Sequence, residues 1–252
     1  MNQTKVTEFI LLGFGNLHHF NSFFFILFLI IFLLTVLGNL LIIVLVSTNM
    51  QLQSPMYYFL CHLSFSDLVI SMNIVPNMLG AMLLGGKIIT YLDCIAQFYF
   101  FSGTTIAECL LLSVMSYDRY LAICNPLRYS SVMDFKRQIY LSLWPWLLGL
   151  TLNLTTVLPI SNFNFCHDNI IDHFFCDLLP LQKLSCSDTS LVELEVISVF
   201  CALIYPSLWL NHCNLCAHLP HHTEDTVYNR QTENLFYLQF SSYSCGNILW
   251  DY

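Results

Sequence analysis

The sequence predicts an all-α membrane protein. Apolar residues make up 56% of the 252 positions and charged residues only 10%, a composition far from that of a soluble globular domain. Residues 22–47 contain no charged side chain, and this run exceeds the roughly 20 apolar residues that a helix needs to cross a bilayer. Because hydrocarbon offers no water to backbone amides, such an uninterrupted run crosses as a helix.

Four further spans follow along the chain. The second begins at Pro55, a residue suited to the first turn of a helix because its missing N–H costs nothing there. The third is expected at about 93–124, the fourth at 139–160 and the fifth at 191–208. Residues 209–252 are polar and patternless, and contain no apolar stretch long enough for another span.

The basic residues predict the orientation. Four of the eight Lys and Arg lie between the third and fourth spans, namely Arg119, Arg128, Lys136 and Arg137. The positive-inside rule places this stretch in the cytoplasm, so the N-terminus and residues 1–21 are expected outside. Asn2, within the pattern Asn2-Gln3-Thr4, is then an acceptor for N-glycosylation.

Charge and motif content exclude other classes. The net charge of -8 repels nucleic acid phosphates, and no basic patch lies away from the membrane, so we expect no nucleic acid partner. No nucleophile, base and orienting group occur together, so we expect neither an enzyme nor a cofactor. A five-span transporter or channel is disfavoured because the chain contains no internal repeat.

The end of the third span carries an acid beside an arginine, in Asp118-Arg119-Tyr120. A charge pair where hydrocarbon meets water is costly to bury and easy to switch, so it is typical of a latch. The alternative, a solvated helix end with an incidental ion pair, is disfavoured by the long flanking apolar runs. Residues 115–129 resemble the signature of rhodopsin-like G-protein-coupled receptors, and specifically of odorant receptors. Residues 52–60, 171–177 and 193–208 resemble the same family.

The resemblance implies the first five helices of a seven-helix receptor that binds a small volatile odorant and signals through a heterotrimeric G protein. Asp118, Arg119 and Tyr120 would form the G-protein switch. The upper half of the third helix would line the odorant pocket with Phe101, Ser102, Thr105 and Ile106. The alternative for these four positions is that they only pack, since an apolar stripe is usually core.

Three polar residues inside the spans, Asn39, Asp67 and Glu108, are either a functional site or structural hydrogen-bonding groups. By resemblance, Asn39 would hold the second and seventh helices. Asp67 and Glu108 would share a core site with a sodium ion or a proton between them, because two close carboxylates do not both stay ionised without a cation.

The loop after the fourth span holds three cysteines, Cys166, Cys176 and Cys186. Such a cluster indicates an oxidising compartment. The resemblance implies two disulfides, Cys94 with Cys176 and Cys166 with Cys186. The competing hypothesis is a zinc site formed by these cysteines with His167 and His173, although extracellular cysteines usually oxidise to pairs.

Residues 209–252 depart from the family. They hold an apparent metal cluster composed of Cys213, Cys216, His212, His218, His221 and His222. We discount it because the genetic code allows codons for residues 223–245 that, shifted by one nucleotide, encode LKIPSTTGRQKTFSTCSSHLTV. That string resembles the third cytoplasmic loop and the start of helix six of odorant receptors. We therefore expect residues 209–252 to be an aberrant, frameshifted and poorly ordered tail, and we expect no metal site.

These expectations define two functions. The first is an odorant receptor in the plasma membrane, with its N-terminus outside and its signalling impaired by loss of helices six and seven. The alternative is a non-signalling truncated receptor that only associates with other membrane receptors or is degraded. Polar side chains left without partners would favour its retention in the endoplasmic reticulum.

Overall fold

The computed structural model describes residues 7–13, 21–49, 52, 54–165, 169–199 and 201–203. Four helices in this part of the chain are long and apolar enough to cross a membrane: α1 (Asn21–Thr48), α2 (Pro55–Leu84), α3 (Tyr91–Cys124) and α5 (Phe135–Ser161). Residues 190–199 and 201–203 are also helical and belong to the expected fifth span. The predicted all-α membrane fold is confirmed. The rest of the fifth span and residues 209–252 lie outside the described residues.

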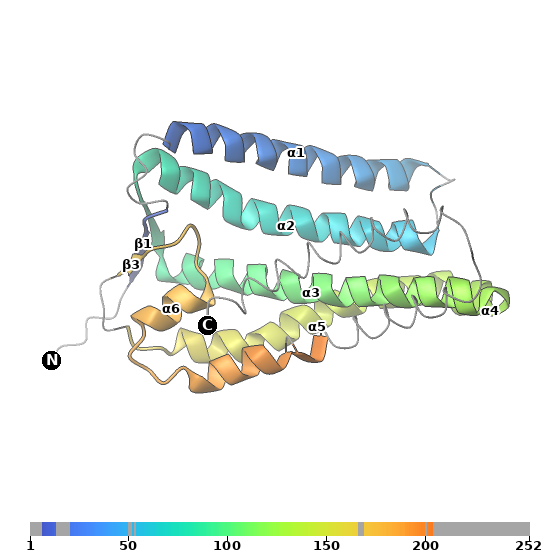
Figure 1. Ribbon diagram of the computed structural model, residues 1–252. Helices are drawn as coiled ribbons and strands as arrows, with labels where there is room; N and C mark the ends of the chain where they lie inside the picture. The colour runs from blue at the N-terminus through green and yellow to red at the C-terminus, as the bar shows by residue number, and fades with distance from the viewer. Residues whose placement is uncertain are drawn as a thin grey trace, which may run out of the picture.

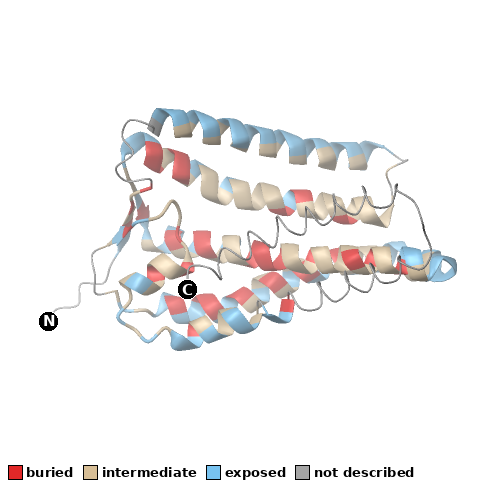
Figure 2. Ribbon diagram, viewed as in Figure 1, coloured by how far each residue is buried: buried red, intermediate tan, exposed pale blue. Residues whose placement is uncertain are grey.

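Helix α3 lies at the centre of the bundle (Figure 1). It packs against α2 and α5, while α1 packs against the outer side of α2. Most of α1 is exposed along its length (Figure 2). Lipid tails are as apolar as the leucine and phenylalanine side chains of α1, so this surface is suited to hydrocarbon.

A glycine allows α3 and α5 to approach closely. A Cβ atom at Gly149 of α5 would lie 2.6 Å from the carbonyl oxygen of Gly103 and 2.9 Å from the backbone nitrogen of Ala107, both on α3. Contacts this short leave no room for a methyl group. Small residues commonly permit such approach between membrane helices.

Polar caps set several helix ends. The Thr90 side chain accepts a hydrogen bond from the backbone N–H of Asp93 at the start of α3, and Asp134 accepts one from Arg137 at the start of α5. These bonds satisfy amides that have no partner within the helix. Helix α2 ends at Gly85, whose φ of 68° is a left-handed conformation that glycine adopts without strain.

A small sheet lies at one end of the bundle, together with the short helix α6 (Leu178–Leu184), and α4 (Pro126–Val132) lies at the other end (Figure 1). The strands are β1 (Glu8–Leu11), β2 (Lys87–Thr90) and β3 (Ile170–Ile171), in the order β2-β1-β3. Strand β1 is antiparallel to β2 and parallel to β3.

Strand β1 was not predicted; it lies in the segment expected only to be extracellular. Phe9 and Leu11 are fully buried on one face of this strand, whereas Glu8 is exposed. This alternation is the signal that a half-buried strand leaves in a sequence. Both side chains join an apolar cluster that also contains Cys94 and Cys176. Strand β1 is therefore part of the structure that covers this end of the bundle.

Candidate functional site

One cavity of about 50 Å³ lies beside α3. Its wall includes all four α3 residues that the resemblance assigned to a pocket, Phe101, Ser102, Thr105 and Ile106. The other lining residues come from α3, α5, the loop before α6, α6 itself and the helix that begins at residue 190: Phe98, Leu152, Asn153, Thr156, Asp177, Leu178, Val196 and Val199. The four predicted residues thus face one space, and their role in binding stays a prediction.

Hydrogen bonds fix the polar part of the cavity wall. The Ser102 hydroxyl lies 2.7 Å from Oδ1 of Asn153 and 2.8 Å from the carbonyl oxygen of Phe98. Nδ2 of Asn153 donates to the carbonyl oxygen of Tyr99 at 2.7 Å. The Thr105 hydroxyl donates to its own helix, at the carbonyl oxygen of Phe101 (2.9 Å). The bonds between Ser102, Asn153 and Tyr99 hold α5 to α3 beside the cavity. The hydroxyls of Ser102 and Thr105 and one N–H of Asn153 are thereby engaged.

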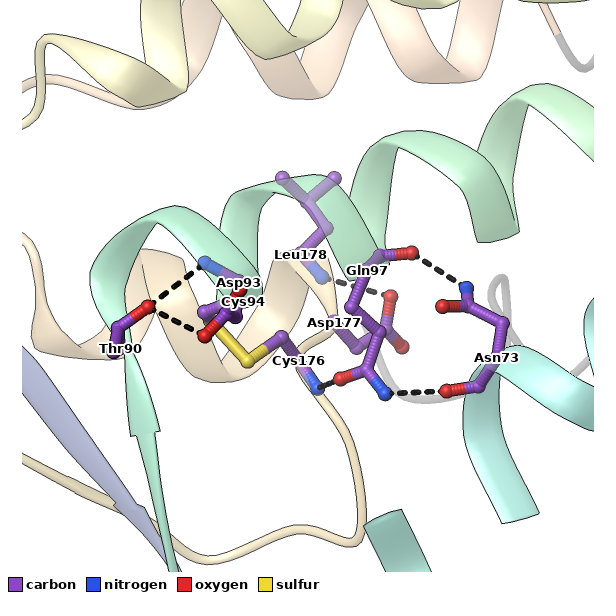
Figure 3. The surroundings of a disulfide bond; sticks show 8 residues. All are labelled: Asn73, Thr90, Asp93, Cys94, Gln97, Cys176, Asp177 and Leu178. Atoms are coloured by element: carbon purple, nitrogen blue, oxygen red, sulfur yellow. Dashed lines mark hydrogen bonds between the residues drawn. A yellow bond between two sulfur atoms is a disulfide. The ribbon is translucent and has the colours of Figure 1, made fainter. Parts of the chain in front are cut away.

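The predicted disulfide between Cys94 and Cys176 is confirmed, with 5.4 Å between the two Cα atoms (Figure 3). Both cysteines are fully buried. This bond ties the loop before α6 to the first turn of α3. Cys176 is therefore not available as a thiolate ligand, which removes it from the competing zinc hypothesis.

The other predicted disulfide is described only in part. Cys186 is disulfide-bonded. Its predicted partner Cys166 lies outside the described residues, as does His167, so this pairing stays a prediction. In the part of the chain that the structure describes, no three His, Cys, Asp or Glu side chains are grouped as metal ligands.

Gln97 is a buried amide that sequence reasoning missed. Its Oε1 accepts the backbone N–H of Cys176 at 3.0 Å, and its Nε2 donates to the carbonyl oxygen of Asn73 at 2.8 Å (Figure 3). Asn73 returns the contact, because its Nδ2 donates to the carbonyl oxygen of Gln97 at 2.8 Å. One side chain of α3 therefore fixes both α2 and the loop. Its position one turn after Cys94 is the only sequence signal that could have indicated this role.

Asp177 follows Cys176 directly and lines the cavity. Its Oδ1 accepts the backbone N–H of Leu178 at 2.7 Å, which caps α6 (Figure 3). Burial raises the pKa of the Asp177 carboxyl above its ordinary value, while the bond from Leu178 and the nearby His173 act in the opposite direction. The carboxyl is thus a partly desolvated acid at the edge of an apolar space.

At the opposite end of α3, the side chain of Asp118 is buried and its Oδ1 accepts a hydrogen bond from the Tyr129 hydroxyl at 2.9 Å. Arg119 extends elsewhere, with Nη2 3.8 Å from Sδ of Met56 on α2. Tyr120 is half-buried. Within the described residues no ion pair joins Asp118 to Arg119, and the role of these residues as a switch stays a prediction. The acid is held by α4, and the arginine reaches α2.

The three polar core residues lie on three helices. Asn39 on α1 donates from Nδ2 to the carbonyl oxygen of Thr35 in its own helix, at 3.1 Å. Asp67 on α2 and Glu108 on α3 are both half-buried. Their grouping into one ion or proton site stays a prediction. Asn2, the expected glycosylation acceptor, lies outside the described residues.

The long apolar helices define a multi-pass helical membrane protein. Its cavity beside α3 is lined in part by the residues that follow the disulfide-bonded Cys176. Residues 28–211 match the family described as olfactory receptor. The chain is 44% identical to olfactory receptor 1f45 of Rattus norvegicus, over 78% of this chain and 63% of the relative. It is 43% identical to human olfactory receptor 11L1, over 82% of this chain and 66% of the relative.

Human olfactory receptor 1J4 is 45% identical, over 81% of this chain and 65% of the relative. The chain belongs to the olfactory receptor family, which is a family of signalling receptors and not of enzymes. The matched part spans a little under two thirds of the length of these relatives.

Proposed function

We propose that this chain binds a small volatile odorant in the cavity beside α3. The observation that carries the proposal is the convergence of Phe101, Ser102, Thr105 and Ile106 on one mostly apolar space between α3, α5 and the disulfide-bonded loop. Pockets for small molecules are typically concave and apolar, with a few polar groups in fixed positions. The bonds of Ser102 and Asn153 supply such fixed groups.

We further propose that the opposite end of α3 meets a heterotrimeric G protein. Asp118, Arg119 and Tyr120 lie there beside α4, and Asp118 already has a partner on α4 in Tyr129. A hydrogen bond between two elements can have two states, made and broken, and a ligand shifts such an equilibrium only if it binds one state better. In this proposal the bond between Tyr129 and Asp118 belongs to the state without G protein.

The proposed location is the plasma membrane, with the N-terminus outside. Four basic residues lie at this end of the bundle: Arg119 in the last turns of α3, Arg128 in α4, and Lys136 and Arg137 in the first turn of α5. Their clustering supports a cytoplasmic position for α4. The disulfide between Cys94 and Cys176 supports an oxidising compartment at the other end of the bundle. The strand β1 lies at that same end.

A second candidate is a chain that reaches membranes but signals weakly or not at all, pairs with other membrane receptors, or is degraded. It is favoured by the composition of residues 209–252, where no stretch approaches the length of a membrane span. Polar side chains of the bundle, such as Asp67 on α2, would then need partners from another protein or stay exposed to lipid.

One cell experiment separates the two candidates. An epitope tag before Met1 is detected with antibody on unpermeabilised cells, and cyclic AMP is measured in the same cells during exposure to a panel of volatiles. Surface labelling with a volatile-dependent rise that Arg119→Ala abolishes supports the receptor. Labelling without any rise supports the second candidate, and signal only after permeabilisation points to retention.

A further inference from the structure

The polar groups of the cavity differ in what they offer a ligand. The hydroxyls of Ser102 and Thr105 donate to protein acceptors, and Asn153 donates one of its two N–H groups to the carbonyl oxygen of Tyr99. The carboxylate of Asp177 has two oxygens with about four acceptor positions, and one of them is used by the N–H of Leu178. Among the described residues that line the cavity, Asp177 alone carries a formal charge. The wall therefore retains acceptor capacity and negative charge.

The position of Asp177 is fixed on both sides along the chain. The preceding residue, Cys176, is held to α3 by its disulfide and by the bond of its N–H to Gln97. The following residue, Leu178, is 5% exposed and begins α6 under the cap that Asp177 itself provides. A side chain positioned by its own neighbours loses little freedom on binding, which favours affinity.

We infer that the cavity selects small apolar molecules that carry a hydrogen-bond donor, above all a protonated amine, and that Asp177 is the residue that makes this selection. This inference rests on the proposed function, because it names the ligand class of the same cavity. The apolar part of the molecule would contact Phe101, Ile106 and Val196, and its nitrogen would meet the free acceptor positions of Asp177.

The chemistry separates amines from carbonyl compounds of equal size. An ammonium group forms a charge-assisted hydrogen bond with a carboxylate, and such bonds are roughly twice as strong as neutral ones. A ketone offers only an acceptor, which would face the carboxylate without a hydrogen atom between them. The hydroxyl of an alcohol donates an uncharged hydrogen bond, so the affinity of an alcohol should lie between those of the amine and the ketone. Thr156 and Asn153 also line the cavity, and the Thr156 hydroxyl and the second N–H of Asn153 are the neutral donors that could serve a carbonyl oxygen.

Three compounds with four-carbon skeletons test the inference: butylamine, 1-butanol and butanone. Binding of each to the purified full chain in lipid nanodiscs is measured by saturation-transfer NMR titration at neutral pH. The native chain is compared with Asp177→Asn, which keeps an oxygen for the N–H of Leu178 and removes the charge. Asp172→Asn is the matched control, because this acid lies in the same loop, is exposed and is absent from the cavity wall.

We expect the native chain to bind butylamine about tenfold more tightly than butanone, a ratio that one charge-assisted bond supplies. Asp177→Asn should bring butylamine to the affinity of 1-butanol, and Asp172→Asn should leave all three affinities within about twofold of native. A native ratio of amine to ketone near one overturns the inference without any variant. If all three compounds bind and Asp177→Asn changes none of the affinities, the inference about Asp177 is overturned, while the proposed cavity remains supported. Absence of binding by every compound overturns both.

Discussion

The hydroxyl of Tyr129 donates a hydrogen bond of 2.9 Å to Oδ1 of Asp118, so the short helix α4 holds the buried acid at the end of α3. Burial raises the pKa of the Tyr129 hydroxyl, and so do the hydrogen bond to Asp118 and the charge of that carboxylate. The tyrosine therefore stays protonated and remains a donor at neutral pH. The acid is held without a bond to the neighbouring arginine.

Replacing Tyr129 by phenylalanine should remove this bond and leave the ring. A hydrogen bond to a charged group contributes about 1.5 kcal/mol or more to stability. Because Tyr129 is partly exposed, we expect a loss of stability near the lower end of this range. We expect a lower thermal unfolding midpoint for the variant in detergent. Tyr140→Phe is the matched control, because Tyr140 is 60% exposed on α5. Equal midpoints for the two variants would show that the bond adds nothing to stability.

Gly149→Ala should separate α3 from α5. The added methyl group would meet the backbone of Gly103 and Ala107 at 2.6 and 2.9 Å, and backbone atoms cannot turn away as a side chain can. Overpacking of this kind costs about 1–3 kcal/mol. The control is Gly38→Ala on α1, where a Cβ atom meets nothing within 4 Å. We expect a lower unfolding midpoint for the first variant only, and a similar midpoint for both would contradict the described contact.

Asp177 should make stability fall as pH rises. Its pKa in the folded chain is raised above the ordinary 3.8, so the folded state binds the proton more tightly than the unfolded state does. Below pH 3.8 the Asp177 carboxyl is protonated in both the folded and the unfolded state, so its burial does not lower stability. As the pH rises from 3.8 to the raised pKa of the folded state, the free energy of unfolding falls progressively, and above that pKa it falls no further. Asp177→Asn should flatten this part of the profile of unfolding midpoint against pH. Asp172→Asn should retain it, and a profile unchanged by either variant would refute the burial of Asp177.

Removing one cysteine of the loop disulfide should release its partner. In Cys94→Ser, the thiol of Cys176 becomes available, so alkylation of the denatured, unreduced chain should add one more label than in the native chain. The unfolding midpoint should also fall, because the bond closes a separation of 82 residues. Cys61→Ser, at a half-buried cysteine outside any disulfide, should remove one label instead. An unchanged label count in Cys94→Ser would exclude this pairing.

The spans and the α3 face could be predicted from the sequence because both depend on local patterns. The charge-free run 22–47 agrees with α1, which is Asn21–Thr48. Phe101, Ser102, Thr105 and Ile106 lie on successive turns of one helix, so their common direction follows from helical periodicity once the family indicates a pocket. Their cavity was not predictable, because Asn153 and Asp177 reach it from other elements.

The features that could not be predicted from the sequence depend on contacts between distant segments. Strand β1 is stabilised by β2 and β3, which lie far along the chain, and four residues alone are too short to form a stable strand. Gln97 acts through Cys176 and Asn73, and a lone amide in a helix pattern does not reveal such partners. The hydrogen bond between Tyr129 and Asp118, eleven residues apart, could not be predicted from the sequence, because it depends on how α4 packs against α3.

A small volatile molecule is proposed to bind in the space beside α3, and a variant that fills this space tests the proposal. Ile106 is 8% exposed and lines the cavity, so Ile106→Trp should fill it. Leu147→Trp places the same side chain on a position of α5 that is 60% exposed and does not line the cavity. Binding of 1-butanol to the purified chain in nanodiscs is measured for both variants and the native chain. We predict native affinity for Leu147→Trp and at least about tenfold weaker binding for Ile106→Trp. Equal affinity in all three proteins would show that 1-butanol does not bind in this space.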